Sequence, residues 1–230
     1  MEGARRRTCA TGHGGAAGPV IIGIDAASAN LSIALLEPDG QMIADDGWAT
    51  AQRQSAELLP RLNDLVRRAD RQLSSTTLVA VGTGPGSFTG LRVAMALAKG
   101  LALGLGRPLV GVGSLPAWLD GVEIAQAALA RAGAHDAYLL TREAAAPVVV
   151  DGAAAREHLA GRPIVAPEEL AAAFGLERAV APRAAAAIAE RARLRLADDP
   201  AGDDVRTLEP SYLRQPRGLE ATTPETVRWL

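Results

Sequence analysis

Several kinds of residue are scarce in this chain, and each scarcity excludes a class of protein. The single cysteine, Cys9, excludes an internal disulfide framework and suits a reducing compartment. Aromatic residues make up only 3% of the chain, so the core must rely on alanine and aliphatic side chains. A formal net charge of −2 provides no global attraction to nucleic acid or anionic membrane. The longest apolar stretch, residues 91–105, contains Arg92 and Lys99, so no uncharged run reaches the roughly 18 residues of a membrane span.

The first 18 residues, MEGARRRTCATGHGGAAG, differ in composition from the rest. They contain basic residues but no apolar segment, so we expect a disordered tail and not a secretory signal. The three consecutive arginines at 5–7 are interpreted as a solvated charge run.

The first half of the chain alternates between strand and helix patterns. Short runs rich in β-branched residues predict strands, and apolar residues three and four positions apart predict helices. The expected strands are residues 19–25, 31–36, 41–49, 78–82 and 107–113, and the expected helices are 55–73 and 88–105. The order is βββαβαβ, an antiparallel meander extended by parallel strands with crossover helices. This is the ribonuclease H-like order of the actin, sugar kinase and Hsp70 (ASKHA) superfamily, so the predicted class is α/β.

The second half gives weaker signals and is expected to form a smaller lobe. Helices are predicted at residues 115–131, 167–174 and 182–196, a hairpin at 138–141 and 147–150, a strand at 163–165, and an acidic loop at 197–204. The expected organisation is therefore a tail over 1–18, an N-terminal lobe over 19–114, and a C-terminal lobe with its own tail over 115–230. Both lobes should hold mixed sheets.

The segment GTGPGSFTGLRVAMALAKGLALGLG, residues 82–106, resembles a phosphate loop at first sight. It has no lysine after its second glycine, as a P-loop requires, and no register matches GxGxxG. A bare helix N-terminus could still bind an anion, but the Ser87 hydroxyl can cap the same N–H groups. We therefore favour a tight strand-to-helix turn, formed by Gly84, Pro85, Gly86, Ser87 and Gly90.

No catalytic constellation is recognisable. The residues around Ser87 do not form the GxSxG nucleophile elbow. His13 lies in the tail, His135 and His158 lie in the weaker C-terminal half, and each is interpreted as a surface histidine. No spacing typical of a metal site occurs. Asp25 ends the first strand, where superfamily kinases hold a metal–phosphate group, and a turn-forming aspartate is an equally good interpretation. We therefore expect no catalytic, cofactor-binding or metal-binding residues.

The helix over 88–105 is apolar nearly all round, with Arg92 and Lys99 on one face. One side can cover the sheet, and either the protein interior or a partner protein must cover the other. We favour the partner, because an exposed apolar strip usually marks an interaction site. The expected interface residues are Leu62, Leu65, Val66, Phe88, Arg92, Met95 and Lys99.

Four stretches also resemble a bacterial family. They are IGIDAASANLSIALL, QSAELLPRL, VGTGPGSFTGLRVAMALAKGLALGLGRPLVGVGSL and EPSYLR, and GPGSFTGLR is the most specific. The similarity to the TsaB (YeaZ) family is dense over residues 20–115 and returns at 209–214. Two segments depart from the family: Gln54 stands where histidine is common, and the DARRGEVY segment is degraded, with ARAG at 130–133 as its nearest remnant.

The resemblance implies a two-lobed actin-like fold and a cytoplasmic, non-catalytic subunit. Such proteins pair with TsaD through two helices of the N-terminal lobe, and the ATPase TsaE joins them. The assembly transfers a threonylcarbamoyl group to adenosine 37 of tRNAs that read ANN codons, giving threonylcarbamoyladenosine (t6A). ATP or ADP would then lie at the boundary of the complex, not in the isolated chain, and a homodimer through the same helices is compatible. The alternatives are a small ATP-dependent kinase-like enzyme and, less in keeping with the residues, a glycoprotease-like hydrolase.

Overall fold

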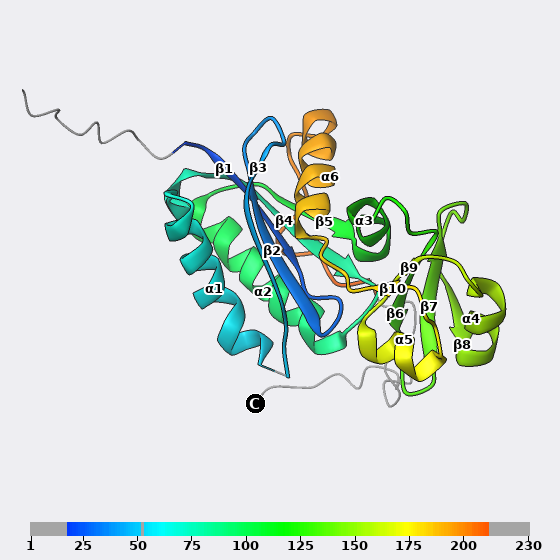
Figure 1. Ribbon diagram of the computed structural model, residues 1–230. Helices are drawn as coiled ribbons and strands as arrows, with labels where there is room; N and C mark the ends of the chain where they lie inside the picture. The colour runs from blue at the N-terminus through cyan, green and yellow to red at the C-terminus, as the bar shows by residue number, and fades with distance from the viewer. Residues whose placement is uncertain (1–17, 52, 212–230) are drawn as a thin grey trace, which may run out of the picture.

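The computed structural model describes residues 18–51 and 53–211. Residues 1–17 of the expected tail and residues 212–214 of the EPSYLR motif lie outside the described residues. The chain forms two five-stranded sheets that lie side by side, each carrying its own helices (Figure 1). The first lobe contains the sheet β3-β2-β1-β4-β5, and the second contains β10-β9-β6-β7-β8.

The first lobe has the element order that the sequence predicts. Its elements are β1 (Val20–Asp25), β2 (Asn30–Leu36), β3 (Met42–Ala49), α1 (Gln54–Arg68), the short helix η1 (Leu73–Ser75), β4 (Thr76–Gly84), α2 (Phe88–Leu105) and β5 (Leu109–Gly113). Strands β1, β2 and β3 form an antiparallel meander, and β4 and β5 extend it in parallel. The expected α/β class and ribonuclease H-like order are therefore confirmed.

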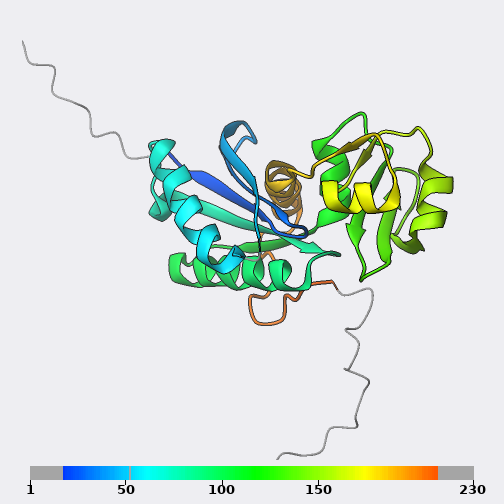
Figure 2. The ribbon, with the colours of Figure 1, turned by 60° about the horizontal axis from the view of Figure 1, so that its bottom comes forward.

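Both faces of the first sheet are buried, because helices cover each of them (Figure 2). On one face, Ile22 and Ile24 of β1 pack against α1 and α2. On the other face, Ile21 packs against α3 (Ser114–Gly121) and α6 (Ala185–Asp198). This double cover explains why the strands are continuous apolar runs without a polar side.

The second lobe differs from its prediction at several places. Its elements are β6 (Ala127–Arg131), β7 (Asp136–Thr141), β8 (Val148–Asp151), α4 (Gly152–Leu159), β9 (Ile164–Val165), α5 (Glu168–Phe174) and β10 (Ala179–Val180). The helix predicted over 115–131 ends at Gly121, and the alanine-rich residues after it form β6, the central strand. Pairing with β7 and β9 on its two sides overrides the helix propensity of alanine. Helix α4 was missed; Asp151 caps it by accepting from Ala153 N and Ala154 N.

The end of the described chain returns to the first lobe. Helix α6 crosses back over β1 and β2, and the residues after it run along the open side of β5. There Asp203 N donates to Leu109 O at 2.7 Å, and its carboxylate Oδ2 accepts from Gly111 N at 2.7 Å. Residues after 115 thus pack in both lobes, and the expected division at 114/115 stays a prediction about domain limits.

Candidate functional site

The turn between β4 and α2 is shaped by close backbone contacts with the loop after β1. A Cβ atom on Gly86 would lie 2.0 Å from Ala27 O, and one on Gly90 would lie 2.1 Å from Ala26 O. Ser87 N donates to Ala27 O at 2.7 Å, while the Ser87 Oγ accepts from Gly90 N at 3.2 Å and caps α2. Gly84 has a φ of +94°, which favours glycine. These contacts account for the glycines of the segment as parts of a turn.

Four of the seven expected interface residues lie in the core and not on a surface. Leu62, Leu65, Val66 and Met95 are between 0% and 4% exposed and pack between α1, α2 and the first sheet. The expectation that they form an open contact face is therefore wrong for this structure. The physical reason is that the broadest apolar stripe of each helix covers the sheet. Only the outward-facing residues of the two helices are then left for contact with a partner.

The outward face of α2 is exposed and is left for contact with a partner. We define the α2 strip as Phe88, Arg92, Ala96, Gly100 and Leu103, which recur three or four residues apart and are all exposed. Leu103 is 69% exposed, and the Arg92 guanidinium carbon lies 3.8 Å from the centroid of the Phe88 ring. Lys99 is half-buried beside this strip. Among the described helices, α2 is long and apolar enough to cross a membrane by length and composition alone, and 33% of it is buried within the fold.

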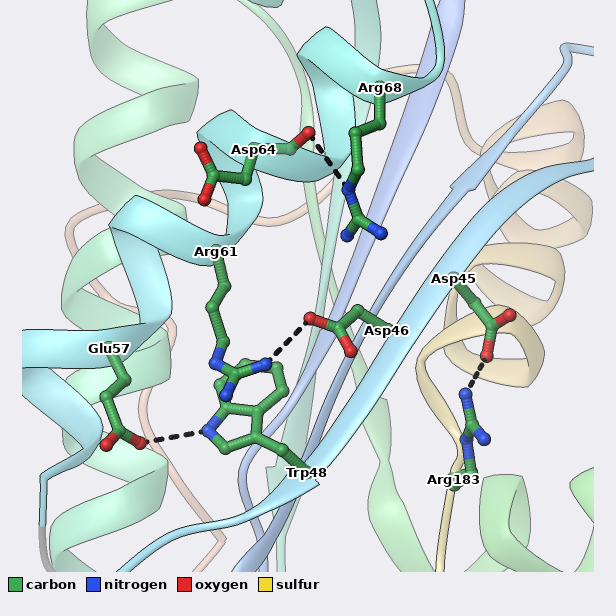
Figure 3. Close-up of polar contacts among 8 residues, drawn as sticks. All are labelled: Asp45, Asp46, Trp48, Glu57, Arg61, Asp64, Arg68 and Arg183. Atoms are coloured by element: carbon green, nitrogen blue, oxygen red, sulfur yellow. Dashed lines mark hydrogen bonds and ion pairs between the residues drawn. The ribbon is translucent and has the colours of Figure 1, made fainter.

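Helix α1 is held to the edge strand β3 by polar contacts (Figure 3). Trp48 Nε1 donates to Glu57 Oε2 at 3.0 Å, and the Arg61 guanidinium stacks 4.4 Å from the centroid of the Trp48 ring. Arg61 also pairs with Asp46 at 3.0 Å. The hydrogen bond from the Thr50 side chain, followed by that from Trp48, lowers the pKa of Glu57. These polar contacts therefore add to the apolar packing that holds α1 against the sheet.

Asp25 is sealed inside the molecule. It is 1% exposed; its Oδ2 accepts from Trp118 Nε1 at 2.6 Å, and its Oδ1 accepts from Ser114 Oγ at 2.9 Å. Ser114 Oγ in turn accepts from Gly84 N at 3.1 Å. Burial raises the pKa of Asp25 in spite of these donors. Asp25 Oδ1 also accepts from Ala27 N at 3.3 Å, which is the local bond of the turn-forming interpretation, and both carboxylate oxygens are used within the fold.

Sequence reasoning did not identify the two residues that bind Asp25. Trp118 and Ser114 lie on α3, where an isolated tryptophan in an apolar run reads as ordinary core. Within residues 18–51 and 53–211, no group of three or more His, Cys, Asp or Glu side chains is placed to hold a metal ion.

A cleft of about 1000 Å³ separates the two lobes. The first lobe contributes residues 27–29 after β1 and the beginnings of α1 and α2; the second contributes residues 131–136 and the beginning of α5. Gln54, the first residue of α1, lines this cleft although it is only 7% exposed. The sequence singled out Gln54 only as a departure from a family pattern, not as part of a cavity.

Comparison with known proteins agrees with this geometry. The family model described as TsaD: tRNA N6-adenosine threonylcarbamoyltransferase matches residues 49–172, more than half of the chain. The TsaB protein of Escherichia coli K12 is 35% identical over 102 residues, which cover 44% of this chain and 43% of that protein. The TsaB protein of Bacillus subtilis 168 is 35% identical over 95 residues, 41% of each chain. These alignments span less than half the length of the curated relatives.

A solved structure shows the same fold over most of the chain. YeaZ from Pseudomonas aeruginosa superimposes with a TM-score of 0.64 at 23% identity, covering 85% of this chain and 100% of that one. The family model covers the chain from the end of β3 into α5, and the structural match covers 85% of the chain. The chain therefore belongs to the family of that model, TsaD: tRNA N6-adenosine threonylcarbamoyltransferase, and it is similar to TsaB proteins in sequence and to YeaZ in fold.

Proposed function

We propose that the chain is a non-catalytic subunit of the machinery that makes t6A in tRNA. In this role it pairs with a TsaD protein, TsaE joins the pair, and the assembly transfers threonylcarbamoyl to adenosine 37 of tRNAs reading ANN codons. The observation that carries the non-catalytic role is the sealed Asp25. The end of the first strand, where kinases of this superfamily hold metal and phosphate, is filled here by Trp118 and Ser114.

The α2 strip is the proposed contact with TsaD. It is exposed, it joins apolar and small residues to the cation of Arg92, and Gly100 leaves open space for a close backbone approach. Lys99 and Arg92 would set specificity by meeting acidic residues across the boundary. The buried residues Leu62, Leu65, Val66 and Met95 support the strip from beneath and do not touch the partner.

The proposal places the protein in the cytoplasm and assigns no cofactor to the isolated chain. ATP or ADP would bind at the boundary of the complex. A kinase-like enzyme is the alternative, and it predicts that the pure chain binds and hydrolyses ATP with magnesium. A sealed Asp25 supports the subunit role over this alternative, because ionised oxygens facing solvent are what a metal–nucleotide requires.

The test is association with TsaD from the same organism, measured by size-exclusion chromatography with light scattering. Leu103→Asp should abolish the heterodimer peak, because it places a charge on the most exposed apolar side chain of the α2 strip. The matched control is Leu194→Asp on α6, a leucine 52% exposed on the opposite face of the sheet, compared with 69% for Leu103. Loss of pairing in both variants, pairing in neither the wild type nor the control, or robust ATP hydrolysis by the pure chain would each contradict the proposal.

A further inference from the structure

The edge strands of the two described sheets are β3 and β5 in the first lobe and β10 and β8 in the second. An exposed edge can pair with another chain through its unused backbone groups, and folded proteins usually protect such edges. β3 carries Asp45 and Asp46, and charged side chains oppose the addition of a strand. The open side of β5 is occupied by Asp203, which bonds to Leu109 and Gly111. β10 is only two residues long.

The edge strand β8 has none of these protections. It contains three consecutive valines, of which Val148 is 55% exposed and Val149 is 41% exposed. Its charged residue, Asp151, stands at its end, where the carboxylate is used to cap α4. The second lobe therefore ends in an uncharged, apolar run of strand that is open to solvent.

The hydrogen bonds of the β6–β7 hairpin determine which residues of β7 face β8. Ala132 N donates to Asp136 O at 2.9 Å, so these two residues form a hydrogen-bonded pair. Such pairs alternate along an antiparallel ladder, so the even-numbered residues of β7 face β6 and the odd-numbered residues face β8. The bond from Arg142 N to Gln126 O at 3.1 Å, beyond the other end of the ladder, has the same phase.

The direction of the backbone groups in β8 follows from this alternation. Ala137 and Leu139 face β8, and the residues opposite them are Val150 and Val148. Val149 lies between these two, so its N–H and C=O groups point away from β7, to the side where no described strand lies. A donor and an acceptor of the same residue are therefore open at the middle of the valine run.

We propose that β8 is the contact surface for a second copy of this chain, which pairs with it antiparallel about a two-fold axis at Val149. Val149 of each copy donates to and accepts from Val149 of the other, and Val148 lies opposite Val150. Asp151 lies opposite Pro147 of the other copy, so no like charges meet, and the missing N–H of Pro147 leaves its carbonyl free to accept from Asp151 N. The strand is thus complementary to itself, which is what a two-fold contact requires.

The pairing joins the second sheets of the two copies into one continuous sheet. Figure 1 shows β8 in the second lobe, on the far side of β7 from α1 and α2. The contact therefore leaves the α2 strip free, and it does not depend on the proposed pairing with TsaD. A single short strand buries less surface than a standard interface, so the dimer is reversible and depends on concentration.

Sedimentation velocity of the full chain, from micromolar to near-millimolar concentration, tests the contact. Val149→Pro removes an N–H that only the second copy uses, and proline is accepted on an edge strand whose N–H side is open. It should raise the dimer dissociation constant by about tenfold or more, because each dimer loses two hydrogen bonds. Val149→Lys places two lysines opposite each other and should have the same effect. It also guards against a folding defect in Val149→Pro, which circular dichroism would reveal.

Two control variants locate the contact. Val180→Lys makes the same change on β10, at the opposite edge of the same sheet, where Val180 is 43% exposed. Leu103→Asp disrupts a dimer formed through the α2 strip. The proposal is supported if the wild type and both controls dimerise and the folded Val149 variants do so more weakly. It is overturned if the wild type stays monomeric at every concentration, if Val149→Lys dimerises as the wild type does, or if Leu103→Asp abolishes the dimer.

Discussion

Trp118 and Asp25, 93 residues apart in the chain, are joined by a hydrogen bond of 2.6 Å from the indole Nε1 to the carboxylate Oδ2. This bond connects the end of the central strand of the first sheet to α3, the helix that leads into the second lobe. Ser114 on the same helix adds a second bond to the same carboxylate. The junction of the lobes is therefore organised around one buried acidic group.

Trp118→Phe should destabilise the protein by about 2–3 kcal/mol, because it keeps most of the ring volume but removes the donor to Oδ2 of the buried Asp25 carboxylate. Chemical denaturation followed by circular dichroism measures this difference. Trp48→Phe is the comparison, since it also removes an indole donor to a carboxylate, that of Glu57, but in a half-exposed site, where the loss of stability should be smaller. If the two variants lose equal stability, burial of the carboxylate does not increase the cost of removing its indole donor.

The raised pKa of Asp25 predicts a pH dependence of stability. The folded state retains the proton on Asp25 above the usual value of 3.8, while the unfolded state releases it. The unfolded state then binds fewer protons, so this group makes stability fall as pH rises from about 3.8 to the folded-state pKa. Asp25→Asn removes that contribution. The stability of the wild type relative to Asp25→Asn should decrease over this window, and parallel denaturation curves across pH would show that Asp25 does not titrate there.

The burial of Met95 predicts opposite results for two neighbouring positions on α2. Met95→Asp places a charge in the core and should cost about 3–5 kcal/mol, whereas Leu103→Asp on the α2 strip should change stability by less than about 0.5 kcal/mol. Thermal and urea unfolding of both variants provide the measurement. A stable, folded Met95→Asp monomer would contradict the burial of Met95 in the core.

Arg142, in the loop between β7 and β8, is expected to contribute to the stability of the fold. Its guanidinium donates to four backbone carbonyl oxygens after α3, those of Leu119, Val122, Glu123 and Ala125, at distances from 2.6 to 3.1 Å. Arg142→Lys retains the charge but cannot reproduce the fork, so we expect a loss of about 1–3 kcal/mol. Hydrogen exchange should quicken in residues 119–126. Unchanged exchange there would mean that the carbonyl groups are held by the rest of the fold.

The sequence predicted the first lobe well because its strands are long apolar runs and its turns carry glycine, proline and aspartate. It failed at β6, where alanine-rich residues have helix propensity but two-sided strand pairing decides the outcome. It also placed Met95 on the wrong side, because a helix that is apolar all round does not reveal which side covers the sheet. Trp118, Ser114 and Gln54 could not be assigned, since their contacts join residues distant in the chain and leave no local pattern.

The return of α6 to the first sheet has a consequence for the order of events during synthesis. Gly23 on β1 meets the backbone of α6 so closely that a Cβ atom there would lie 2.1 Å from Ala185 O. The face of the first sheet around Ile21 and Ala34 therefore stays uncovered until residues 185–198 have left the ribosome. By then the whole second sheet has already emerged. The lobe that begins first is completed last, so a nascent chain stalled before α6 would present an apolar sheet face to chaperones.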